Sequence, residues 1–140
     1  MPPILLVAIG GALGSVARYL LAGAFNPPAL LAQPQPGAPQ WSAFPTGTLV
    51  VNFIGCAAIG LIAGWLGVGI AEGASTPNPA WRPFLLTGIL GGFTTFSAFS
   101  METLLLARAG MWLPASIYVV ASTVLGIALA FAGYKATCHP

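Results

Sequence analysis

The sequence predicts an all-α integral membrane protein with four transmembrane helices. Hydrophobic residues make up 57% of the 140-residue chain and charged residues only 4%, against about 25% charged residues in a typical soluble domain. Six charged side chains cannot cover a folded protein in water, and a net charge of +2 is too small to bind a phosphate backbone. Soluble enzymes, nucleic-acid-binding domains and disordered chains are therefore excluded. The charged residues are Arg18, Glu72, Arg82, Glu102, Arg108 and Lys135.

Four apolar segments are long enough to cross a bilayer, because about 20 helical residues span a hydrocarbon core of about 30 Å. We expect them to form one membrane domain over residues 1–140, placed in the inner (plasma) membrane of a cell. The segments run over about residues 4–25, 46–70, 81–107 and 112–134.

Prolines and tryptophans mark the ends of these segments. The first segment follows Pro3, and the second opens just after Pro45. The linker 26–45 between them holds six prolines and no charge, which predicts an irregular loop outside the membrane. Trp81 and Trp112 begin the third and fourth segments, where an amphipathic indole ring suits the interface.

The third segment contains a pattern that disfavours a continuous helix. Gly91 and Gly92 are adjacent near the middle of the span, and the β-branched Thr94 and Thr95 follow them. A helix break in a membrane leaves backbone groups without partners, so this backbone must face protein, water or an ion. Discontinuous helices of transporters bind ions at such breaks. A glycine pair that permits close helix packing is the alternative interpretation.

Polar residues also occur at depth in the other segments. Arg18 lies about fifteen residues into the first helix, Asn52 early in the second, and Ser122 and Thr123 midway through the fourth. Each alone can serve as a hydrogen-bonding contact between helices. Together they indicate a polar track across the membrane, which a passive anchor does not need.

Charges in the loops give almost no orientation signal. Four spans place Arg82 and Lys135 on one side of the membrane and Arg108 on the other, and the positive-inside rule needs a clear excess. Two interpretations stay open. The chain can insert in one orientation fixed by weak charges, or it can insert in both and pair antiparallel with itself.

Phe96 and Phe99 follow the glycine pair at a spacing that places both rings on one helix face. The edge of an aromatic ring is electropositive, so two ring edges can stabilise a small dehydrated anion without a full positive charge. Ordinary apolar packing is the alternative for any such pair.

Three motifs resemble those of the small fluoride channels called Fluc or CrcB. Residues 10–19, GGALGSVARY, resemble the family's GGxxGAxxRY opening, and residues 47–55, GTLVVNFIG, resemble its GTxxVNxxG motif. Residues 91–100, GGFTTFSAFS, are similar to its GGxTTFSTFS stretch. The departures are Ser15 for alanine, Ala57 where an aromatic is common, and Ala98 for threonine, which removes one hydroxyl beside the phenylalanines.

The resemblance implies an antiparallel, dual-topology homodimer with two pores and a broken third helix. It also implies that fluoride leaves the cytoplasm passively, which relieves fluoride toxicity. Backbone carbonyls of Gly91 and Thr94 would hold a structural Na⁺ at the dimer centre, and Arg18 would lie at a water-filled vestibule. The role of Glu102 stays open between helix-end solvation, pairing with an arginine and ion contact. The residues implied for the fluoride pathway are Asn52, Phe96, Phe99, Thr48, Ser97, Tyr118 and Ser122.

Other functions fit less well. A small multidrug exporter, or another small-ion transporter, is the closest alternative, but exchange of protons for a cationic drug needs a carboxylate in the first helix. That helix carries Arg18 and no acidic residue. A structural membrane subunit would not need a mid-span break beside a cluster of hydroxyls. The chain carries no catalytic or phosphate-binding motif, so we do not expect an enzyme.

Overall fold

The computed structural model describes residues 2–25, 39, 41, 43–66 and 82–138. In this part of the chain the structure is all-helical, and four helices are long and apolar enough to cross a membrane. They are Pro3–Phe25, Thr46–Trp65, Pro83–Arg108 and Trp112–Thr137. The prediction of an all-α chain with four spans is therefore confirmed.

The first two spans are α1 (Pro3–Phe25) and α2 (Thr46–Trp65). The third consists of the π-helical η1 (Pro83–Leu90), the short α3 (Gly91–Phe93) and α4 (Phe96–Arg108), and the fourth is α5 (Trp112–Thr137). The helix α2 ends at Trp65, and Leu66 is its C-cap. The helix therefore ends before residue 70, where the sequence placed the end of the second span. Residues 67–70 and Trp81 lie outside the described residues.

The helix α5 continues past the predicted end at Tyr134 to Thr137. The predicted end lies just before the first charge after the apolar run, Lys135. That side chain remains in the last turn of the helix, and its ammonium lies 5.0 Å from the centroid of the Phe131 ring. A lysine near a helix end can keep its charged head at the interface while its apolar stem lies along the helix. A charge at this position therefore does not end the helix.

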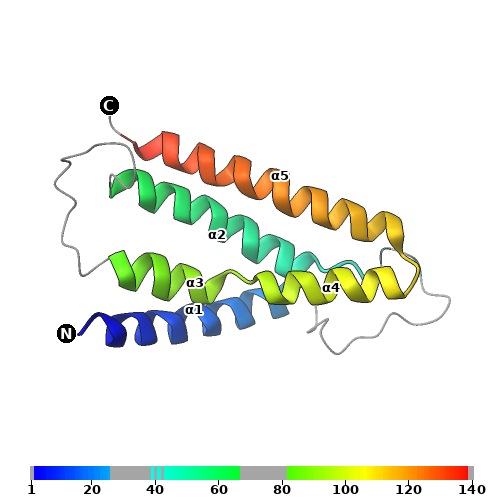
Figure 1. Cartoon of the computed structure of the whole chain (residues 1–140), viewed down its shortest axis with the longest axis horizontal. Helices are drawn as coiled ribbons and strands as arrows, with labels where there is room; N and C mark the ends of the chain where they lie inside the picture. Colours follow the sequence, from blue (N-terminus) through cyan, green and yellow to red (C-terminus); the bar gives the residue numbers. More distant parts are fainter. Residues whose placement is uncertain (1, 26–38, 40, 42, 67–81, 139–140) are drawn as a thin grey trace.

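Successive spans run in opposite directions, so α1 begins and α5 ends at the same end of the bundle (Figure 1). Arg82 precedes η1 at that end, and Lys135 lies in the last turn of α5. Arg108 lies in the last turn of α4, at the opposite end. The weak two-against-one balance of charges read from the sequence is thus a property of the folded chain.

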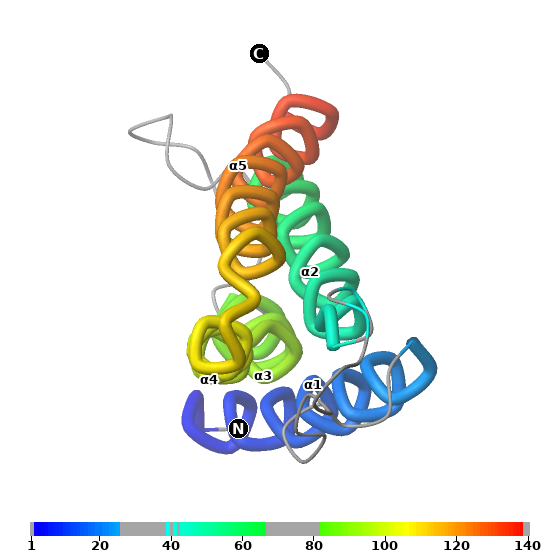
Figure 2. Tube along the Cα trace, turned by 90° about the vertical axis from the view of Figure 1, so that its right-hand side faces the viewer, coloured from blue at the N-terminus to red at the C-terminus, as the bar shows by residue number. Residues whose placement is uncertain are grey.

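Small residues allow the helices to approach closely. The most extensive packing joins α2 with α5, while α1 packs against η1 and α3 (Figures 1 and 2). A Cβ atom added at Gly14 of α1 would overlap the Ile89 carbonyl oxygen of η1, and one added at Gly92 would lie 2.5 Å from the Gly11 carbonyl oxygen. Close backbone approach at small residues is the usual packing mode of membrane helices. The close contact of Gly92 with Gly11 fixes the position of α3 against α1.

The third span changes conformation at Thr94 and Thr95. Gly91 and Gly92 remain helical, whereas Thr94 (φ −80°, ψ 154°) and Thr95 (φ −146°, ψ 117°) are extended. The Thr95 hydroxyl then accepts a hydrogen bond from the Ala98 N–H, 3.2 Å away, and caps the start of α4. The sequence predicted poor helix over the glycine pair and the two threonines that follow it. Only the threonines are extended, and Gly92 stays helical in close contact with α1.

Candidate functional site

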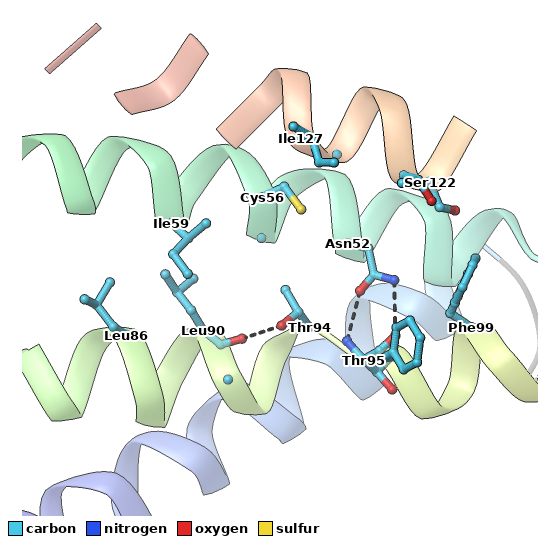
Figure 3. Close-up of a pocket in the computed structure, with 15 residues that line it drawn as sticks. Asn52, Cys56, Ile59, Leu86, Leu90, Thr94, Thr95, Phe99, Ser122 and Ile127 are labelled. Carbon is cyan, nitrogen blue, oxygen red and sulfur yellow. Dashed lines mark hydrogen bonds between the residues drawn. The ribbon is translucent and has the colours of Figure 1, made fainter. Parts of the chain in front are cut away.

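A groove of about 380 Å³ lies beside the extended residues, between α2, the third span and α5 (Figure 3). Its wall is mostly apolar, with a few amide, hydroxyl and backbone groups. The lining residues are Asn52, Gly55, Cys56, Ile59, Leu86, Leu90, Gly91, Thr94, Thr95, Phe96, Phe99, Ser122, Thr123, Gly126 and Ile127.

Asn52 of α2 satisfies the backbone of Thr95. Its Nδ2 donates to the Thr95 carbonyl oxygen at 3.2 Å, and its Oδ1 accepts from the Thr95 N–H at 2.9 Å (Figure 3). Asn52 thus replaces the helical acceptor of the Thr95 N–H and adds a donor to the Thr95 carbonyl. Because an asparagine amide carries two hydrogens, the second N–H remains for a ligand in the groove that Asn52 lines.

The same rearrangement releases the carbonyls of Gly91 and Thr94. In a continuous α-helix these oxygens would accept from the N–H groups of Thr95 and Ala98, four residues on. The Thr95 N–H is bound to Asn52, and the Ala98 N–H is bound to the Thr95 hydroxyl. Gly91 and Thr94 both line the groove. Uncharged carbonyl oxygens of this kind suit a hard cation such as Na⁺.

A buried carboxylate lies behind the groove wall. Glu102 of α4 is 7% exposed, and each of its carboxylate oxygens accepts one hydroxyl. Thr48 of α2 donates to Oε1 at 2.7 Å, and Tyr118 of α5 donates to Oε2 at 2.7 Å. These bonds join three spans at one point. This pairing with two hydroxyls is not among the three roles that the sequence left open for Glu102.

The two phenylalanines lie side by side at the groove. Their ring centroids are 5.6 Å apart with planes tilted by 41°. Phe96 is 79% exposed, whereas Phe99 is half-buried and packs against Tyr118 at a centroid distance of 5.1 Å. The exposed Phe96 ring can therefore meet a ligand or a second molecule, while Phe99 is held from behind by the buried Tyr118.

The remaining predicted residues divide between the groove and its surroundings. Ser122 lines the groove, and its buried Oγ has no hydrogen-bond partner among the described residues. Ser97 is exposed and its hydroxyl lies 3.3 Å from that of Thr95. Arg18 is half-buried, with an Nε that makes no hydrogen bond within the described part of the chain.

The structure therefore brings Asn52, Phe96, Phe99 and Ser122 together with Gly91 and Thr94 around one groove. It does not place Thr48, Tyr118, Ser97 or Arg18 in the lining. Thr48 and Tyr118 lie on the Glu102 carboxylate instead. Thr95 also lines the groove. The sequence marked it as a poor helix former because it is β-branched, but not as a site residue.

The groove offers an amide N–H, several hydroxyls and two aromatic rings, and no charged side chain is among its lining residues. Donors and ring edges without a fixed charge can hold a small anion weakly enough to release it. No acidic or histidine side chain that could act as a general base is among the lining residues.

The family model and the curated relatives that match this chain point to the same family. Residues 5–134 match the family model described as "CrcB-like protein, Camphor Resistance (CrcB)". A protein from Methylobacillus flagellatus, named fluoride-specific ion channel FluC, is 42% identical over 135 residues, covering 96% of this chain and 94% of the relative. Proteins of the same name from Paracoccus denitrificans and Caulobacter vibrioides are 45% and 43% identical, over 91% and 95% of this chain and 87% and 93% of the relatives.

Proposed function

The chain belongs to the CrcB family, and we propose that it is a fluoride channel that exports cytoplasmic fluoride passively. It is a multi-pass membrane protein, not an enzyme, and the inner membrane of a bacterium is where such export has its effect. Weakly acidic HF crosses a membrane and dissociates in a near-neutral cytoplasm. A channel returns the trapped anion to the outside down its potential gradient.

The observation that carries the proposal is the double hydrogen bond of Asn52 at the groove. Thr95 uses one amide hydrogen and the amide oxygen, and this fixes the orientation of the side chain. The second hydrogen of Nδ2 is then a preoriented donor for an anion that has lost its water. Such an anion needs donors at every point of its path because desolvation is costly.

Phe96 and Phe99 supply the rest of the proposed contact. Their rings lie beside Asn52 in the groove, and an electropositive ring edge attracts an anion. Ser122 adds a buried hydroxyl to the same wall. Thr48 and Tyr118 support the path from behind the groove through their bonds to Glu102. We assign Ser97 to one approach to the path and Arg18 to the vestibule, where its charge raises the local anion concentration.

An antiparallel, dual-topology homodimer is the assembly that we propose. Large apolar side chains are exposed on all four spans, including Leu13, Ile54 and Val120, so lipid or a second copy must cover them. The two-against-one balance of basic residues gives neither orientation an advantage. The groove is open on one side, and the exposed ring of Phe96 beside it suits closure by a second copy.

The discontinuity in the third span supplies the proposed Na⁺ site. The Gly91 and Thr94 carbonyls, whose helical donors are engaged elsewhere, would hold the ion together with the same groups of the second copy. When bound, Na⁺ would supply a positive charge that joins the two copies. The donor set fits this ion because hard cations prefer oxygen ligands.

The groove argues against the alternative of a small multidrug exporter. An exporter of cationic drugs needs a carboxylate that faces the drug and exchanges it for protons. The helix α1 contains no acidic residue, and both oxygens of Glu102 are engaged by hydroxyls. Passive conduction needs no such group.

Fluoride release from liposomes tests passive conduction. Purified protein is reconstituted into vesicles that contain potassium fluoride, and a fluoride electrode follows the outside solution. A passive channel moves net charge, so release should begin only when valinomycin lets K⁺ follow. Release of equal size without valinomycin would indicate coupling to protons and would contradict the passive mechanism.

A further inference from the structure

A row of aromatic rings runs from the segment before α2 to the groove. The ring centroids of Trp41 and Phe44 are 5.8 Å apart, and those of Phe44 and Tyr118 are 5.7 Å apart. Tyr118 then lies 5.1 Å from Phe99, which lies 5.6 Å from Phe96. Each contact is within the range of favourable aromatic pairs. The row therefore links residues outside the spans to the proposed ion contact.

Backbone contacts hold Phe44 at the start of α2. Its N–H donates to the Trp41 carbonyl oxygen at 3.2 Å, and its own carbonyl accepts from the Thr46 N–H at 2.8 Å. The adjacent Pro45 is fully buried. Phe44 is thus fixed on both sides, and its ring packs on the core formed by Leu106, Met111, Ala115 and Tyr118.

Tyr118 lies between Phe44 and Phe99. Its side chain is 0% exposed, and its hydroxyl is held by Glu102. The Phe44 ring meets it at an interplanar angle of 75°, an edge-on arrangement, while Phe99 contacts it with a tilt of 50°. A ring held at its hydroxyl and by two neighbouring rings has little room to tilt. Removal of the Phe44 ring would give it that room.

We propose that Phe44 is a positioning residue for fluoride permeation, acting through Tyr118 to hold Phe99 at the groove wall. This inference rests on the proposed function, because it takes Phe99 as an ion contact. It gives a role to the end of the proline-rich linker 26–45, for which the sequence indicated none. An aliphatic residue at position 44 would fill similar space without the directional edge-on contact.

Variants at position 44 separate a ring effect from a volume effect. Phe44→Leu and Phe44→Met keep an apolar side chain of similar size, whereas Phe44→Tyr and Phe44→Trp keep a ring. The matched control is Phe131→Leu, an exposed phenylalanine on α5 that does not line the groove. Dimers are verified by size-exclusion chromatography, and fluoride efflux from liposomes is measured over a range of fluoride concentrations.

The Leu and Met variants should assemble but conduct at least about tenfold more slowly, whereas the ring-retaining variants and the control should stay within about threefold of the parent. The half-saturating fluoride concentration should rise in the Leu and Met variants, because a displaced Phe99 binds the ion less well. A smaller folded fraction would instead lower the maximal rate and leave that concentration unchanged.

Several results would overturn the inference. An assembled Leu or Met variant with the parent rate would do so, as would a Tyr or Trp variant that loses as much as Leu. Failure of both Leu and Met variants to assemble would assign Phe44 to folding and reject the positioning role. A parent protein that releases no fluoride would instead reject the proposed function, so the two failures can be distinguished.

Discussion

The side-chain amide of Asn52 and the backbone of Thr95 form a reciprocal pair, with bonds of 3.2 Å and 2.9 Å across two spans of the same chain. This pair lets the third span change conformation within an apolar bundle without leaving the Thr95 groups unsatisfied. It also fixes the amide at the groove. Asn52 thus satisfies the backbone of Thr95 and also presents its amide to the groove.

Asn52→Ala should abolish fluoride flux, because alanine offers no donor to the ion. It should also destabilise the protein by about 1–3 kcal/mol, the usual cost of leaving buried backbone groups unpaired. Fluoride efflux and thermal unfolding of the detergent-solubilised dimer measure the two effects. Ser116→Ala, at an exposed α5 position outside the groove lining, is the control. Parent-level flux in Asn52→Ala would reduce Asn52 to a contact between helices.

Phe96→Leu and Phe99→Leu should each lower fluoride flux by at least about tenfold, equivalent to about 1.4 kcal/mol in the barrier. Similar-sized apolar exchanges usually cost less than about 1.5 kcal/mol in stability, so the dimers should still form. Phe99→Leu should be the less stable, because Phe99 is half-buried against Tyr118 whereas Phe96 is 79% exposed.

Efflux and size-exclusion chromatography test these variants, with Phe131→Leu as the control for loss of an exposed ring. An assembled variant that conducts at the parent rate would remove the aromatic assignment at that position.

Gly14→Ala should prevent the close contact of α1 with η1 and α3. The added Cβ would overlap the Ile89 carbonyl oxygen and lie 2.9 Å from the Phe93 nitrogen. Overpacking of this kind costs about 1–3 kcal/mol, seen as a lower unfolding temperature in detergent. Gly11→Ala, on the same helix, is the matched control because its Cβ would meet nothing within 4 Å. Equal stability of the two variants would contradict this packing.

Two lysines added beside Arg108 should trap one membrane orientation and abolish fluoride resistance in cells that contain no other copy. Basic residues are retained on the cytoplasmic side, and the parent carries only a two-against-one balance. Co-expression of a variant with two lysines added beside Lys135 should restore resistance by supplying the opposite orientation. A biased chain that protects cells alone would rule out the antiparallel dimer.

The sequence was sufficient to predict the spans, because hydropathy and helix length depend on local composition. Asn52 and the phenylalanines could be selected for the same reason, as polar or paired residues at depth. The run of two glycines and two threonines in the third span could be identified as poor helix, but not which of its residues are extended. Local propensity disfavours helix at Gly91 and Gly92, but close packing on α1 keeps Gly92 helical, and Asn52 satisfies the backbone at Thr95 instead.

The hydroxyl pair on Glu102 also could not be predicted. Thr48 lies 54 residues from Glu102 along the chain and Tyr118 lies 16 residues from it. Their meeting depends on how three helices rotate about their axes, which a uniformly apolar sequence specifies poorly. The contact of Phe44 with Tyr118 likewise depends on the path of the linker as it enters α2.

Selective conduction of fluoride by this chain is tested by comparing the release of fluoride with that of chloride. Verified dimers are reconstituted into liposomes loaded with both potassium salts, and ion-selective electrodes follow both anions after valinomycin is added. We predict rapid release of fluoride while chloride stays inside until detergent breaks the vesicles. Retention of fluoride by vesicles that contain folded dimer, or release of both anions at equal rates, would contradict it.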